Sequence, residues 1–94
     1  MDAIQEAIAE LTLNLAKARF AMAAEAGDRR GMGLAVAWAY RELAGSKMVA
    51  FFRATGLRPT SAEARALNQI GAACPELQGR GTRQLDERAA TQPA

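Results

Sequence analysis

Residues 4–23 read IQEAIAELTLNLAKARFAMA, and their apolar side chains fall into two helical sets. One set has the 4-3-4-3-4 spacing of a coiled-coil seam and consists of Ile4, Ile8, Leu11, Leu15, Ala18 and Met22. The other is spaced 4-3-4-3 and consists of Ala9, Leu13, Ala16, Phe20 and Ala23. At the helical turn of about 100° per residue, the two sets centre at about 40° and about 180° around the axis. The stretch therefore predicts one helix with two opposed apolar faces, either enclosed by its own domain or shared with a partner.

Both ends of this first helix carry capping signals. Asp2 is a favourable N-cap residue, and Gln5 follows three positions later, as in a capping box. Gly27 is a typical residue just past a helix C-terminus. We therefore expect the helix over about 2–26.

The middle of the chain leaves two interpretations of its helices open. Residues 27–33, GDRRGMG, predict a connection because they hold three glycines, and Asp28 is a candidate N-cap. Further on, Gly45 and Ser46 either separate two helices or lie within one helix, where the glycine costs about 1 kcal/mol. A 4-3-4-3-4 register favours one helix over about 28–55, and its members are Leu34, Trp38, Arg41, Gly45, Met48 and Phe52.

The last predicted helix has the clearest boundaries. Gly56 ends the preceding segment, and the sequence Thr60-Ser61-Ala62-Glu63 is typical of a capping box that opens a helix. That helix, over about 61–74, stops before Pro75 because proline disfavours the helical conformation of the residue preceding it. Residues 75–94 hold only two large apolar side chains, so we expect a single helical domain over 1–74 and a flexible tail over 75–94.

These elements predict an all-α protein: an antiparallel helical hairpin (about 2–26 and 28–55) with a short third helix (about 61–74). About a quarter of the 94 residues are alanine, which buries little surface, and a single cysteine allows no intrachain disulfide. Because so small a core gains from association, we expect a helical-bundle homodimer. Its predicted interface is apolar and consists of Ala9, Leu13, Ala16, Phe20, Trp38, Tyr40 and Phe51.

The sequence also bears on location. Residues 1–6 lack the basic region of a signal peptide, and no run of about 18 apolar residues is free of charge. A lone Cys74 suits a reducing compartment. We therefore expect a cytoplasmic protein without membrane contact. In composition the chain resembles the small alanine- and arginine-rich helical regulators and inhibitors of bacteria, phages and plasmids, and this resemblance assigns no role to any residue.

The inventory of reactive side chains argues against catalysis. The sequence has no histidine, which is the most common general base and metal ligand. Cys74 is more typical of a packing residue than of a nucleophile, because no base accompanies it. We therefore expect no enzymatic activity, no cofactor and no metal. The leading hypothesis is a protein-interaction module that regulates or inhibits a larger partner by direct binding.

DNA binding is the alternative, because residues 28–65 carry seven bases and three acids. Residues 48–67 have the outline of a helix-turn-helix, with a helix, a glycine turn and a second capped helix. Phe52 weakens this interpretation, since it occupies a position where the motif prefers a small side chain. The candidate contacts to nucleic acid or to an acidic partner are Arg29, Arg30, Arg53, Arg58, Thr60, Ser61 and Arg65.

Overall fold

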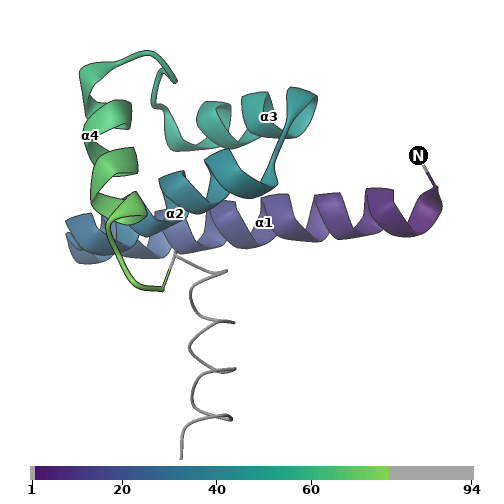
Figure 1. The fold of residues 1–94 in the computed structure, drawn as a ribbon, viewed down its shortest axis with the longest axis horizontal. Coiled ribbons are helices and arrows are strands. Elements are labelled where there is room, and N and C mark those ends of the chain that lie inside the picture. The colour runs from purple at the N-terminus through teal and green to yellow at the C-terminus, as the bar shows by residue number, and fades with distance from the viewer. Residues whose placement is uncertain (1, 77–94) are drawn as a thin grey trace, which may run out of the picture.

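A computed structural model describes residues 2–76 of the chain, and Figure 1 shows their arrangement. These residues form four α-helices and no strand: α1 (Ala3–Ala26), α2 (Arg29–Glu42), α3 (Gly45–Thr55) and α4 (Ala62–Ala72). The all-α prediction is confirmed, and α1 has nearly the expected bounds. Residues 77–94 of the predicted tail lie outside the described part of the chain.

The capping signals of α1 act as expected. The Asp2 carboxylate accepts a hydrogen bond from the backbone N–H of Gln5 at 2.8 Å. At the other end Gly27 has φ +69°, a left-handed conformation that favours glycine. The N–H groups of Gly27 and Asp28 donate to the carbonyls of Ala24 and Ala23, which completes a Schellman motif.

The glycine-rich segment is helical over most of its length, contrary to the predicted connection. Only Gly27 and Asp28 link α1 to α2, and the Asp28 side chain caps α2 by accepting from the N–H of Gly31 at 2.9 Å. Gly33 lies inside α2 because α4 crosses there at very short range. A Cβ atom on Gly33 would lie 2.7 Å from the carbonyl oxygen of Leu67. The glycine thus serves helix packing, which overrides its low helix propensity.

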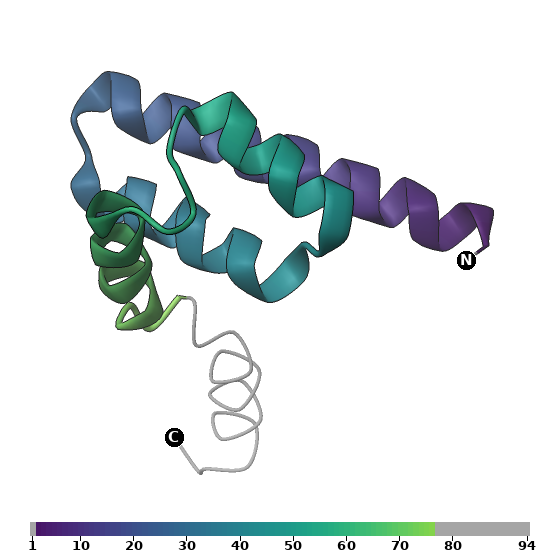
Figure 2. The same cartoon turned by 90° about the horizontal axis from the view of Figure 1, so that it is seen from above.

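The prediction of one continuous helix over 28–55 is also wrong. The chain leaves α2 at Leu43, passes through Ala44 in extended conformation and turns at Gly45, where φ is +55°. Figure 2 shows α3 running back over α1 instead of prolonging α2. This reversal brings Phe51 against Phe20 of α1, whereas a straight helix would have carried it away from the core. Residues 2–76 therefore form four helices where the sequence predicted three.

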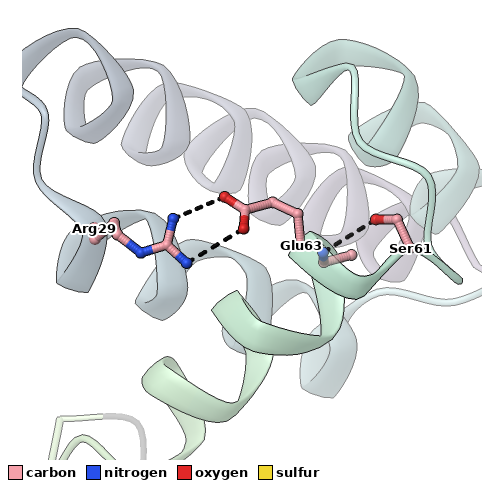
Figure 3. A network of polar contacts seen from close by, with 4 residues as sticks. Arg29, Ser61 and Glu63 are labelled. Carbon is pink, nitrogen blue, oxygen red and sulfur yellow. Dashed lines mark hydrogen bonds and ion pairs between the residues drawn. The ribbon is translucent and has the colours of Figure 1, made fainter.

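The cap of α4 is displaced by one residue from the predicted capping box. Ser61 is the N-cap, and its hydroxyl accepts from the N–H of Ala64 at 3.1 Å and donates to the carbonyl of Arg58 at 2.7 Å. Glu63, now in the first turn of α4, pairs instead with Arg29 of α2, as Figure 3 shows.

The core lies where α2 meets α1 and α4, with α3 closing over α1. Its centre is aromatic, because the rings of Phe20 and Phe51 meet edge to face with centroids 6.2 Å apart, and Phe52 stacks edge-on against Phe51 at 5.3 Å. The other core members are Leu13, Ala16, Ala35, Val36, Ala39, Leu43, Ala64 and Leu67. The N-terminal end of α1 projects beyond the other three helices in both views (Figures 1 and 2).

Candidate functional site

An exposed apolar stripe runs along α1 on the side away from the core. We call it the α1 seam, and its members are Ile4, Ile8, Leu11, Leu15, Ala18 and Met22. The fractional exposures of the five large side chains, in chain order, are 71%, 57%, 60%, 43% and 72%. Large apolar side chains exposed in a contiguous row are typical of interaction surfaces. The α1 seam is therefore the candidate functional site.

The opposite face of α1 fills the core. Leu13, Ala16 and Phe20 are buried, with fractional exposures of 4%, 0% and 7%. On this face large side chains alternate with alanines, a pattern that lets a neighbouring helix approach closely.

The residues predicted from sequence as a protein interface belong mainly to the packing of the chain itself. Leu13, Ala16, Phe20 and Phe51 are buried in the core, while Ala9 and Trp38 are half-buried. Besides the ring contact of Phe20 with Phe51, two more of the seven residues have specific contacts. The guanidinium carbon of Arg19 lies 5.3 Å from the centre of the Trp38 ring, and the Tyr40 hydroxyl donates to the carbonyl of Pro59 at 3.1 Å. These placements move the candidate interface to the other face of α1.

The positions beside the α1 seam are almost uncharged. On one flank lie Ala7, Asn14 and Ala21, and on the other lie Gln5, Thr12 and Arg19. Arg19 is thus the one ionised side chain at either flank over residues 4–22. A seam with few flanking charges accepts an apolar partner without burying unpaired ions.

The acids of the first half of α1 are held on the α3 side of the helix. The Lys47 ammonium lies 2.9 Å from a carboxylate oxygen of Glu6 and 3.2 Å from one of Glu10. These hydrogen bonds to Glu6 and then Glu10 raise the pKa of Lys47 above its ordinary value. Lys47 therefore stays protonated and ties the start of α3 to the first half of α1.

Two of the hollows beside α1 lie between this helix and a neighbouring segment. The larger, of about 450 Å³, lies between the first half of α1 and the turn that joins α2 to α3, and Gln5, Ile8 and Thr12 line it. The second, of about 370 Å³, lies between the end of α1 and the start of α2, and it is mainly apolar. Met22 of the α1 seam and Leu34 of α2 line this second hollow, so its wall is continuous with the seam.

Two of the seven predicted nucleic-acid contacts are engaged in ion pairs. The guanidinium group of Arg29 makes a bidentate ion pair with the carboxylate of Glu63, with N–O distances of 2.8 and 3.3 Å (Figure 3). A guanidinium nitrogen of Arg30 lies 2.6 Å from a carboxylate oxygen of Glu76. Hydrogen bonding to Arg29 and the attraction of its charge hold the pKa of Glu63 below its ordinary value. Hydrogen bonding to Arg30 does the same for Glu76.

The other candidate contacts do not form one surface of a helix-turn-helix. Arg53, Arg58, Thr60 and Arg65 are exposed, while Ser61 serves as the cap of α4. Within residues 2–76, α4 packs on α2 and makes no direct helix contact with α3. In a helix-turn-helix the two successive helices pack on each other. The sequence over 48–67 therefore has the outline of a helix-turn-helix, but the structure does not have the geometry of that motif.

The side chains of residues 2–76 include no cluster of three or more acids or cysteines that could hold a metal ion. Cys74 is buried, with a fractional exposure of 6%, and its thiol donates to the carbonyl of Ile70 at 3.2 Å. None of the helices in this part of the chain is long and apolar enough to span a membrane.

Comparison with known proteins adds no relative: no family model matches the chain, and no match was found among curated proteins or solved structures.

Proposed function

We propose that this chain is a non-enzymatic helical interaction module that regulates or inhibits a larger protein by direct contact through the α1 seam. The proposal rests on one observation, the row of exposed apolar side chains from Ile4 to Met22 on a helix whose other face already fills the core. This row is about 27 Å long, since 18 residues each add about 1.5 Å. With a width of about 10 Å it covers about 300 Å², the size of the functional patches that monomeric proteins expose.

Two further features support this reading over an enzyme. The sequence has no histidine, and the thiol of Cys74 is buried against a backbone carbonyl. A cytoplasmic location belongs to the same proposal, since a single cysteine suits a reducing compartment.

Contact with nucleic acid or an acidic protein through the basic residues remains the alternative proposal. Arg53, Arg58 and Arg65 are exposed and make no ion pair with other residues of the 2–76 range. They lack the packed helix pair that would present them to a groove, so this alternative has the weaker support.

Site-specific photocrosslinking in the cells that produce this chain tests the proposal. A photoreactive amino acid at Leu11, in the α1 seam, should give covalent adducts with a protein larger than this chain. The matched control carries the same amino acid at Ala54, an exposed position on α3, and should give none. Equal adducts from both positions, or adducts only with nucleic acid, would contradict the proposed function.

A further inference from the structure

We propose that the α1 seam also binds the same seam of a second copy of this chain, with the two α1 helices antiparallel. Ile4 of each copy then packs at Met22 of the other. The inference rests on the proposed function in one respect, namely that the α1 seam is a protein-binding surface. It adds the identity of one partner and the geometry of the contact.

The spacing of the α1 seam is self-complementary. When a second α1 is reversed and laid along the first, Ile8 meets Ala18 and Leu11 meets Leu15. Every layer then joins side chains from the two alternating core positions of the heptad, which is the pairing that antiparallel helices require. The Ile8 layer pairs a large side chain with a small one, and the Leu11 layer pairs two leucines.

Charge favours the antiparallel arrangement over the parallel one. Residues 2–10 carry three acids and no base, whereas residues 17–19 carry two bases and no acid. Antiparallel helices bring the acidic half of each copy near the basic half of the other, and their dipoles oppose each other. Parallel helices would place acid beside acid. Lys47 already offsets two of these acids, so the effect is a modest preference for one orientation.

The projecting end of α1 supplies a third reason. The side chain of Ile4, in the first turn of α1, is 71% exposed. In the antiparallel pair this end reaches Met22 of the second copy, which borders the apolar hollow lined by Ala26 and Leu34. In a parallel pair the two projecting ends would meet only each other. The antiparallel pair therefore covers more apolar surface.

The size of the contact predicts a reversible dimer. A stable interface covers about 800 Å² on each partner. The α1 seam of about 300 Å² by itself falls short of this, so we expect a reversible dimer that is half-formed at about 10 µM.

Cysteine crosslinking of the full chain tests the orientation. In a Cys74→Ala background, which removes the native thiol, one variant carries Ile8→Cys and another carries Ala18→Cys. Antiparallel pairing brings these two positions to the same level, so an equimolar mixture should form a crosslinked heterodimer on oxidation or with a short bis-maleimide. Each variant alone should give almost none, because ten residues of helix separate the like cysteines by about 15 Å, beyond the reach of a disulfide. Crosslinking by each variant alone would instead show parallel helices and overturn the inference.

Sedimentation equilibrium of the native chain tests association itself. The native protein should dimerise, and Leu11→Glu/Leu15→Glu should weaken dimerisation at least tenfold. The control Ala24→Glu/Ala54→Glu adds the same charge at exposed positions outside the α1 seam and should leave dimerisation unchanged. Circular dichroism of every variant shows whether its helices are retained. A strictly monomeric native chain overturns the homodimer, and adducts of Leu11 with a larger protein would then still support the proposed function.

Discussion

Gly33 and Gly71 bring the backbones of α2 and α4 into direct contact. Both residues are buried, and a Cβ atom built on Gly71 would overlap the carbonyl group of Gly33. The methyl group of Ala37 and the backbone carbonyl of Leu67 border this crossing. The residue types at this crossing therefore set how closely the two helices approach.

Gly71→Ala should destabilise the protein. Overlap with Gly33 forces α4 away from α2, and such overpacking costs about 1–3 kcal/mol, more than the gain of about 0.5–1 kcal/mol in helix propensity. Urea denaturation measures the change. Ala72→Gly, at the exposed last residue of α4, is the control, and because it lies at the helix end it should cost less than the roughly 0.5–1 kcal/mol of a helix interior. A more stable Gly71→Ala variant would show that the crossing has room for a methyl group.

Local capping was predictable at this scale, whereas the glycine crossing was not. Asp2, Gly27 and Asp28 act through hydrogen bonds within three to five residues, so the sequence alone identifies them. The role of Gly33 depends on Gly71, which lies 38 residues away. A glycine-rich segment contains no information about that distant partner, and by itself it predicts a connection.

Among the elements, α1 has two apolar faces that serve different purposes. Both faces have helical periodicity, so the pattern predicted the helix and its two faces. It did not reveal which face is the core, because that depends on the side chains that α2 and α3 present. Phe20 packs on Phe51 of α3, and this tertiary contact places the Leu13 and Phe20 face of α1 in the core.

Leu13→Ala and Leu15→Ala form a matched pair that tests the assignment of the faces. Leu13 is 4% exposed and Leu15 is 43% exposed, so the same change removes a core side chain in one case and a surface side chain in the other. We expect a loss of about 2–5 kcal/mol for Leu13→Ala and less than about 1 kcal/mol for Leu15→Ala. Urea denaturation should be done well below the dimerisation midpoint. Comparable losses of stability in the two variants would contradict the assignment of Leu13 to the core and Leu15 to the surface.

In the molecule as a whole, the turn between α2 and α3 determines the topology. The heptad-like register across Gly45 favoured a single helix, but such spacing also arises when two separate helices each face the core. Met48 and Phe52 therefore keep the register of Trp38 without continuing its helix. The direction of α3 follows from the burial of Phe51 and Phe52, a long-range requirement that local spacing does not encode.

Gly45→Ala distinguishes the two topologies. With φ at +55°, an alanine at this position should destabilise the fold by about 1–2 kcal/mol. In a continuous helix the same change would stabilise it by about 1 kcal/mol. Thermal unfolding gives the sign directly, since about 1 kcal/mol shifts Tm by about 4–8 °C in a domain of this size. An increase in Tm would contradict a turn with positive φ at Gly45.

The separation of the two faces of α1 has an evolutionary consequence. The α1 seam and the core face share no residue, so a substitution such as one at Leu11 changes the outer surface of α1 without opening a cavity in the core. A helix that folds through Leu13 and Phe20 can therefore accumulate changes along its outer side while the fold is kept. Under the proposed function, a lineage carrying this scaffold would acquire new binding specificity in single steps, each tolerated by the fold.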